Sequence, residues 1–264
     1  MVGNATRDLY RLITGDSGSP IPTPDPDPVD PQTIGTAIRV GVTEGFGVGE
    51  NGPSGLASHS SNLYMIGSSH DALFTLNTTT GVATRVGSAT AFGANATVPG
   101  GITSHGGVLY MVDRAVRALF TVDPTTGVAT RVGSATAFGV NETSPSGLTS
   151  HNNVLYMVGS SNDVLYTLNT TTGVATRVGS ATAFGVSETA PSGLASHSNT
   201  LYMGGGRDST LYTLNATTGV ATRFGSATGF GVDESNPSGL TSHNNALYMV
   251  GSFNAALYRL ITGD

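Results

Sequence analysis

The sequence contains no cysteine and no lysine, and few of its residues carry a charge of either sign. Of its 264 residues, 11 are Lys or Arg, all of them arginine, and 17 are Asp or Glu, which gives a formal net charge of −6. Without cysteine the chain has no disulfide framework, no thiolate nucleophile and no cysteine-based metal site. Nucleic acids and anionic membrane surfaces bind clustered cations, which are missing here, so neither is expected as a partner.

Long apolar runs are also missing. No segment approaches the roughly 18 apolar residues of a membrane-spanning helix, so no membrane insertion is expected. The first residues do not show the basic and then apolar pattern of a secretion signal. Low charge combined with abundant Gly, Ser and Thr suits a durable scaffold outside the cell. We therefore expect an extracellular or cell-surface location.

What the sequence does contain is a 46-residue repeat without insertions or deletions. The middle copy begins at Pro145 and reads PSGLTSHNNVLYMVGSSNDVLYTLNTTTGVATRVGSATAFGV. Landmark residues recur at this interval, namely His59, His105, His151, His197 and His243, Arg39, Arg85, Arg131, Arg177 and Arg223, and Phe46, Phe92, Phe138, Phe184 and Phe230. A fixed period of this length predicts a propeller or a solenoid.

Each unit is expected to form four strands, bounded by Gly-, Asn- and Ser-rich turns. In the middle copy the strands are predicted at residues 147–150, 154–158, 164–168 and 174–178. The repeat region, residues 35–264, begins with a fourth strand and stops after a third strand, so pairing its two ends completes the last sheet and leaves no open edge. The sequence therefore predicts an all-β, five-bladed β-propeller. Its closure is assigned to Ile38, Val40, Leu257, Tyr258 and Leu260.

The chain starts with a copy of its own end. Residues 1–16 match the last sixteen at eleven positions, and a Pro-rich segment, residues 17–34, follows as an extended linker. Three interpretations of the copy remain open. It is the tail of a preceding propeller in a tandem array, a stray half-repeat, or a donor strand that replaces the third strand of a neighbour and joins copies into a homopolymer. The donor strand would consist of Leu9, Tyr10, Arg11, Leu12 and Ile13.

The repeat resembles a known type of bacterial propeller blade. The segments PSGLTSH, LYMVG and LYTLNTTTGVATRVG look like the YVTN-type repeat, which is related to NHL and PQQ-like repeats, and the resemblance covers residues 35–264. Seven blades are common in that family, whereas five blades resemble the tachylectin type. The resemblance implies the propeller fold and leaves function open, because propellers carry many activities.

The recurring histidine follows the innermost strand of each unit. Five histidines in a ring could surround an axial ion or anion. The ring also arises if each histidine closes a turn by hydrogen bonding to the backbone and was copied with its unit, which is the interpretation we favour, and no metal is assigned. The recurring arginine lies on the outermost strand, where it is expected to guard the sheet edge.

The loops on the opposite side of the ring hold the remaining candidates. The crossovers between units carry Glu50, Glu142, Glu188 and Glu234, which we expect to be solvated acids, with an acid-lined cation or sugar site as the alternative. The copies differ most in the loops between their second and third strands, where a binding surface and neutral drift explain the differences equally well. The candidate ligand residues there are Asp71, Arg114, Arg117, Asn162, Asp163, Arg207, Asp208 and Asn254.

No paired acid and no nucleophile–base couple accompanies these residues. The sequence therefore predicts a protein that is not an enzyme and has no cofactor. We expect an extracellular structural or adhesive propeller module whose partner is itself, in a tandem array or a polymer. Three alternatives remain: a lectin-like propeller that binds surface glycans at several equivalent sites, an enzyme or cofactor-binding propeller, for which the sequence shows no catalytic constellation, and a designed symmetric repeat protein.

Overall fold

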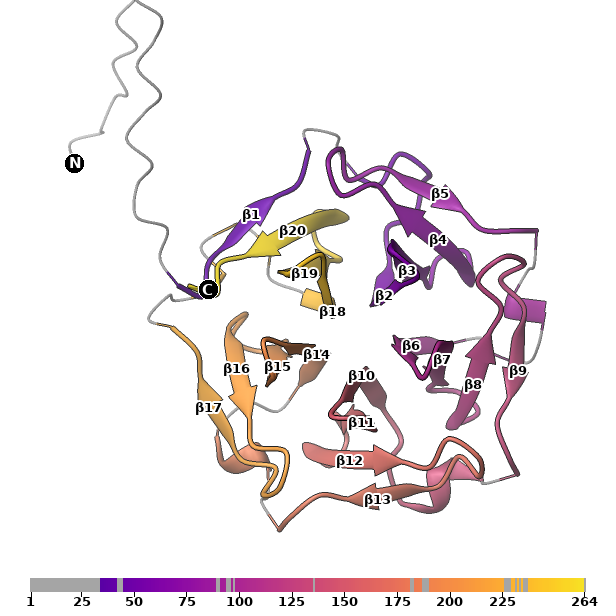
Figure 1. Cartoon of the computed structure of the whole chain (residues 1–264), viewed down its shortest axis with the longest axis vertical. Coiled ribbons are helices and arrows are strands. Elements are labelled where there is room, and N and C mark those ends of the chain that lie inside the picture. The colour runs from indigo at the N-terminus through magenta and orange to yellow at the C-terminus, as the bar shows by residue number, and fades with distance from the viewer. Residues whose placement is uncertain are drawn as a thin grey trace, which may run out of the picture. The chain divides into compact units, whose positions relative to one another are not determined.

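The computed structural model describes residues 34–41, 45–88, 91–93, 96, 98–134, 136–180, 183–186, 190–225, 229–230, 232, 234 and 237–263. These residues form five antiparallel sheets of four strands, and the sheets surround a central axis (Figure 1). The fold is an all-β, five-bladed propeller, which confirms the prediction from the repeat. Among the described residues, no helix combines the length and the apolar character needed to cross a membrane.

Each blade runs outward from the axis in strand order, and blade 5 borrows its outermost strand from the start of the repeat region. Blade 1 consists of β2 (Pro53–His59), β3 (Asn62–Gly67), β4 (Ala72–Leu76) and β5 (Ala83–Arg85). Blade 2 consists of β6 (Pro99–His105), β7 (Val108–Asp113), β8 (Ala118–Val122) and β9 (Ala129–Arg131). Blade 3 consists of β10 (Pro145–His151), β11 (Val154–Gly159), β12 (Val164–Leu168) and β13 (Ala175–Arg177). Blade 4 consists of β14 (Pro191–His197), β15 (Thr200–Gly205), β16 (Leu211–Leu214) and β17 (Ala221–Arg223). Blade 5 consists of β18 (Pro237–His243), β19 (Ala246–Gly251), β20 (Ala256–Leu260) and β1 (Ala37–Arg39). Short 3-10 helices lie in three crossovers, η1 (Ala91–Gly93), η2 (Ala137–Gly139) and η3 (Ala183–Gly185).

The ring closes through β1 and β20, as the sequence predicts. Ile38 lies opposite Arg259 in this antiparallel pair, and the Val40 N–H donates to the Leu257 carbonyl at 2.8 Å. Tyr258 and Leu260 are buried beside this junction. The predicted strands agree with the structure except for the innermost one, which extends from Pro145 instead of residue 147 because the pairing continues across an irregular register step. The half-repeat 1–16, its donor residues 9–13 and linker residues 17–33 lie outside the described residues, so their roles stay predictions.

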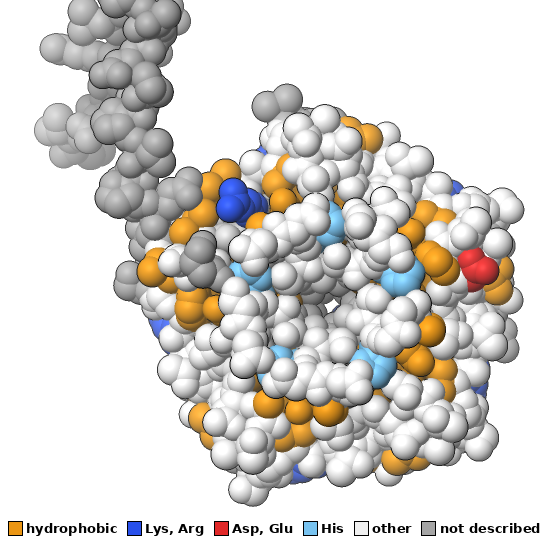
Figure 2. Space-filling view, in the orientation of Figure 1, with side chains coloured by type: hydrophobic (Ala, Val, Ile, Leu, Met, Phe, Trp, Pro, Cys, Tyr) orange, Lys and Arg blue, Asp and Glu red, His pale blue; other side chains and the backbone are white. Residues whose placement is uncertain are grey.

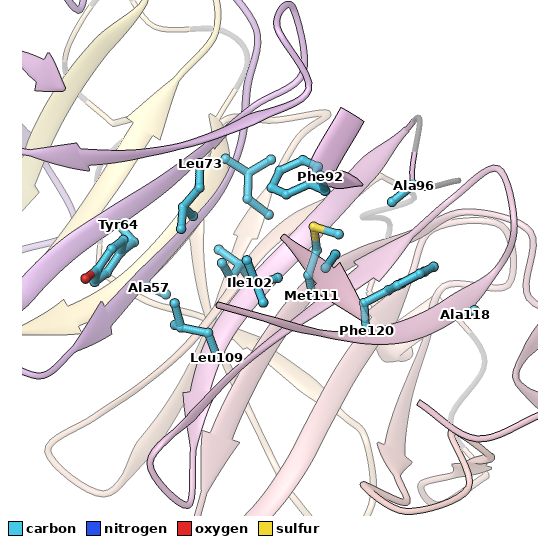
Figure 3. Close-up of a cluster of buried hydrophobic side chains, with 13 residues drawn as sticks. Ala57, Tyr64, Leu73, Phe92, Ala96, Ile102, Leu109, Met111, Ala118 and Phe120 are labelled. Carbon is cyan, nitrogen blue, oxygen red and sulfur yellow. The ribbon is translucent and has the colours of Figure 1, made fainter. Parts of the chain in front are cut away.

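The apolar core lies between neighbouring blades and not on the axis. Figure 3 shows one such layer, in which Leu73 of blade 1 faces Ile102 and Met111 of blade 2, and Phe92 comes from the crossover that joins them. The Phe92 side chain is fully buried, and so are its equivalents in the other crossovers. Burial of one such ring contributes roughly 1.5–3 kcal/mol. The repeating phenylalanine thus attaches each crossover to the blade that follows it.

A ring of glycines closes the axis. A Cβ on Gly147 would lie 2.7 Å from the Leu194 backbone nitrogen, and a Cβ on Gly193 would lie 2.8 Å from the Leu240 nitrogen. Both contacts are with the backbone of the next blade, so only glycine lets the innermost strands approach this closely. The axis has no water-sized space at this level. The glycine ring therefore separates the two faces of the propeller and forms a floor for anything that binds above it.

Candidate functional site: an axial bowl on the loop face

The histidines encircle the axis on the face that carries the turns between first and second strands, which we call the turn face (Figure 2). Each Nδ1 atom is hydrogen-bonded to a serine hydroxyl of the neighbouring blade at 2.8–2.9 Å, in the pairs His59–Ser104, His105–Ser150, His151–Ser196, His197–Ser242 and His243–Ser58. The expectation that they bond to the backbone of their own turn is therefore wrong. They link the blades into a closed circle. The described residues contain no group of three or more His, Asp or Glu side chains able to hold a metal ion.

The opposite face, which we call the loop face, carries the crossovers and the loops between second and third strands. Three crossover glutamates, Glu50, Glu142 and Glu234, are buried there, which corrects the expectation of solvated acids. The Glu142 carboxylate accepts hydrogen bonds from the Ser144 N–H at 2.8 Å and from the Ser161 N–H at 3.2 Å. We call this arrangement a carboxylate clamp, because one side chain holds a crossover to the adjacent loop.

Blade 2 builds the same clamp from the opposite side. Ala96 occupies the position of the glutamate, and Asp113 occupies a position that is glycine in the other four blades. The Asp113 carboxylate accepts from the Val98 N–H and the Val116 N–H, both at 2.9 Å. In blades 1, 3 and 5 a Cβ on that glycine would overlap the glutamate carboxylate. The blades therefore place one carboxylate at this point in two ways. Either the crossover supplies a glutamate and the second strand ends in glycine, or the crossover has alanine and the second strand ends in aspartate.

The clamped loops surround a bowl of about 340 Å³ on the axis. Eight serines line it, Ser54, Ser68, Ser144, Ser146, Ser160, Ser192, Ser238 and Ser252, together with the first prolines of three innermost strands and with Gly52 and Ala190 of the crossovers. The Ser146 hydroxyl donates to the Pro191 carbonyl at 2.6 Å, so its oxygen remains available as an acceptor. The Ser54 hydroxyl is buried, with 6% of the residue exposed, and has no hydrogen-bond partner in the described part of the chain. A buried hydroxyl without a protein partner in a concave site is able to hydrogen-bond to a bound molecule.

Arg114 is the one charged residue that lines the bowl. Its Nε–H donates to the Pro145 carbonyl at 3.1 Å, and no carboxylate of the described residues forms an ion pair with it. Burial lowers the pKa of Arg114, and the nearby charge of Asp113 acts in the opposite direction. An arginine stays protonated under such a shift. The bowl thus combines one positive charge with a ring of hydroxyl groups.

A histidine–carboxylate pair lies in the adjacent loop of blade 1. His70 Nδ1 is 3.0 Å from the Glu50 carboxylate, and the imidazole is 41% exposed. Burial raises the Glu50 pKa, but hydrogen bonds from His70 and from the N–H groups of Gly52 and Ser69 outweigh it, so the pKa is lowered. With Nδ1–H directed at the carboxylate, Nε2 carries the lone pair of the ring. His70 itself does not line the bowl.

The other predicted loop residues do not meet at one point. Asn162 and Asn254 donate to the hydroxyls of Tyr166 and Tyr258 at 3.3–3.4 Å, and Asp208 accepts from the hydroxyl of Tyr212. In blades 1 and 2, where phenylalanine replaces tyrosine, His70 and Val116 occupy the Asn position. Asp71, Asp163 and Arg117 adopt positive φ at the ends of their loops, and Arg207 is exposed. Glu188 lies outside the described residues. A ligand role for these residues stays a prediction.

The serines of the bowl were missed by the sequence reasoning. Most of them belong to the Pro-Ser-Gly start of an innermost strand or to the loop after a second strand, and Ser144 lies in a crossover. Such serines are common in turns. The signal in the sequence that could have revealed the bowl is in blade 2. There Gly100 replaces the serine of the Pro-Ser-Gly start, and Arg114 replaces the serine that follows the second strand. Because the closed ring brings every copy of a position to the axis, a change in one copy is a change in the wall of a shared site.

With the geometry established, the comparisons with known proteins concern the fold. No protein-family model and no curated protein matches the chain. Among solved structures, glutaminyl cyclase from Myxococcus xanthus is similar with a TM-score of 0.58 at 14% identity, over 86% of this chain and 97% of that one. A gluconolactonase from Xanthomonas campestris is similar with a TM-score of 0.51 at 15% identity, over 87% of this chain and 89% of the gluconolactonase. Virginiamycin B lyase from Staphylococcus aureus is similar with a TM-score of 0.47 at 14% identity, over 82% of this chain and 67% of the lyase.

These likenesses correct one expectation. The fold is shared with named enzymes, the glutaminyl cyclase and the gluconolactonase, at TM-scores above 0.5. The prediction of a purely structural or adhesive module that is not an enzyme is therefore wrong. It rested on the lack of a catalytic constellation in the linear sequence, and a propeller assembles its axial site from all of its blades. Identities this low show the fold alone, and they do not identify the repeat family.

Proposed function

We propose that the chain is a propeller enzyme whose substrate is a small hydroxylated molecule bound in the axial bowl, with a sugar lactone as the test substrate. The observation that carries the proposal is the bowl itself, which is closed below by the glycine ring and lined by eight serines and one arginine. Few polar groups placed in a concave site are the usual means of orienting a small polar ligand. The buried Ser54 hydroxyl without a partner supports this role.

The proposed reaction is hydrolysis at an acyl carbon. Water adds to the lactone carbonyl, the ring C–O bond breaks, and the ring oxygen takes a proton and leaves as a hydroxyl group, so that a hydroxy acid is formed. Negative charge develops on the carbonyl oxygen in the transition state, and Arg114 is the group of the bowl able to stabilise it. The named activity of the gluconolactonase motivates the choice of a lactone.

The test is hydrolysis of glucono-δ-lactone, followed by acid release at constant pH against the spontaneous rate. We expect saturable hydrolysis that Ser54→Ala reduces, because this variant removes a bowl hydroxyl and leaves no buried hydrogen-bond partner behind. Thr213→Ser on the turn face is the control and should hydrolyse at the wild-type rate. A rate equal to the spontaneous one, at protein concentrations that would reveal ten turnovers per hour, would remove the proposal.

We also propose a repeat family and a location for the protein. The repeat belongs to the YVTN, NHL and PQQ-like group, which the Pro-Ser-Gly start of the innermost strand and the Asn-Thr-Thr-Thr-Gly turn support. The location is extracellular or at the cell surface, which the low charge and the hydroxyl-rich composition support. Detection of the protein in the culture medium of its source organism, or only inside the cells, decides the second.

A further inference from the structure

Blade 2 differs from the other blades at four positions that act on one another. Ala96, Gly100, Asp113 and Arg114 replace residues that are glutamate, serine, glycine and serine in blade 3. Arg114 lines the bowl, Ala96 and Asp113 lie at the clamp, and Gly100 occupies the position at which the other blades place a serine in the wall. Neutral drift in a loop would not be expected to exchange residues in compensating pairs.

The first pair preserves the clamp. Asp113 supplies the carboxylate that Ala96 cannot, and it directly precedes Arg114 in the chain. The carboxylate accepts hydrogen bonds from two backbone N–H groups, that of Val98 in the crossover and that of Val116 in the loop that carries the arginine. The loop that presents the guanidinium is thereby fixed before any ligand arrives, which lowers the entropy lost on binding.

The second pair reproduces in blade 2 a hydrogen bond that blade 3 has in the wall of the bowl. In blade 3 the Ser146 hydroxyl donates to the carbonyl of the next blade's first proline, Pro191, at 2.6 Å. Gly100 lacks this hydroxyl, and the equivalent carbonyl, that of Pro145, receives the Nε–H of Arg114 instead, at 3.1 Å. One edge of the guanidinium is therefore held by the protein. Its two terminal amino groups have no hydrogen-bond partner among the described residues.

We infer that blade 2 is specialised to hold an anionic group, a carboxylate or a phosphate, in the bowl through the terminal amino groups of Arg114. The inference rests on the proposed function and names its ligand class: hydroxylated acids and acid phosphates, bound one per propeller. The paired amino groups of a guanidinium match the two oxygens of a carboxylate or phosphate. The serine ring, which is neutral, receives the hydroxyl groups of the same molecule.

The experiment compares three probes that share a chain of hydroxyl groups. D-gluconate ends in a carboxylate, sorbitol 6-phosphate ends in a phosphate, and sorbitol ends in a hydroxymethyl group. Binding to the full chain is measured by calorimetry at low salt. We expect at least one anionic probe to bind roughly 10- to 100-fold more tightly than sorbitol, the range for hydrogen bonds to charged groups. The difference between the two anions tells a carboxylate site from a phosphate site.

Two variants and one control make the test specific to Arg114. Arg114→Ser should remove the preference for the anion, so that the anionic probes and sorbitol bind with similar affinity. The fourfold variant A96E/G100S/D113G/R114S should do the same, and it gives blade 2 the residues with which blade 3 already folds. Arg117→Ser removes a cation from the same loop outside the bowl and should keep the preference.

The outcomes separate this inference from the proposed function. Equal affinity for sorbitol and the anions, or an anion preference that survives Arg114→Ser, overturns the inference and leaves the bowl as a binding site. Loss of the preference in Arg117→Ser as well also overturns it, because the effect would then be one of general charge. Failure of all three probes to bind overturns both. Anion binding without lactone hydrolysis supports the inference and removes the proposed activity.

Discussion

Blade 3 can be converted to the clamp of blade 2, and the energetic result follows from the structure. In Glu142→Ala the N–H groups of Ser144 and Ser161 lose a buried charged acceptor. Hydrogen bonds to charged groups contribute about 1.5–3 kcal/mol each, and water reaches part of this loop, so we expect a loss of about 2–4 kcal/mol. In Gly159→Asp the new side chain overlaps the Glu142 carboxylate and places two like charges together. We expect a similar loss of about 2–4 kcal/mol.

The double variant E142A/G159D should recover most of this stability. The introduced aspartate would stand where Asp113 stands in blade 2 and would accept the Ser144 N–H in the way that Asp113 accepts the Val98 N–H at 2.9 Å. We expect the double variant to lie within about 1 kcal/mol of the wild type, which is a coupling energy of at least about 3 kcal/mol. Urea unfolding followed by far-ultraviolet circular dichroism measures all four proteins. If the two losses simply add, the equivalence of the two clamps is refuted.

Three further outcomes are expected. Burial lowers the pKa of His151 and of His243 below the imidazole value of about 6.5. As the pH falls, the unfolded chain therefore binds protons before the folded protein does, and the stability should decrease below about pH 6.5. Thermal unfolding between pH 8 and pH 5 measures this, and a melting temperature that rises as the pH is lowered would contradict it. Gly147→Ala pushes a methyl group to 2.7 Å from the Leu194 nitrogen and should cost more than about 2 kcal/mol in urea unfolding, so an unchanged midpoint would show that the axis is loosely packed. Asn169→Ala removes the acceptor of the two N–H groups that follow it in its turn, both at 2.9 Å, and should cost about 1 kcal/mol, whereas Asn169→Asp, which reproduces the turn of blade 2, should cost less.

The fold was predictable from the sequence because a gapless period constrains topology more strongly than local propensity does. The repeat region begins with a fourth strand and ends with a third strand, which predicts that β1 pairs with β20. The observed pairing contains the residues that were predicted to close the ring. The innermost strand was predicted too short, since Pro-Ser-Gly is typical of a turn when read locally. In the ring, the same three residues continue the strand, because the next blade packs against their backbone.

The site was less predictable, for a physical reason. The exposure of Glu142 was misjudged because a charged residue in a polar loop is usually solvated, and only the folded loop shows the N–H groups that bury it. The aligned copies show that blade 2 has Ala96 in place of a glutamate and Asp113 in place of a glycine. That these two changes compensate each other becomes clear only when the folded structure shows the two positions side by side. Arg114 was among the predicted ligand residues, whereas the serines around it come together only through the closure of the ring.

The pairing of β1 with β20 has a consequence for synthesis on the ribosome. The two strands are separated by more than two hundred residues, so β1 is made before the other strands of the ring and β20 after them. Four blades are able to pair internally while the chain is still growing, but β1 presents an unpaired edge until translation has passed Leu260. During that interval a second nascent chain on the same messenger offers an identical β20, and unpaired edges of this kind invite association between molecules. Slow decoding of the last blade should therefore increase the yield of interlinked copies at the expense of separate rings.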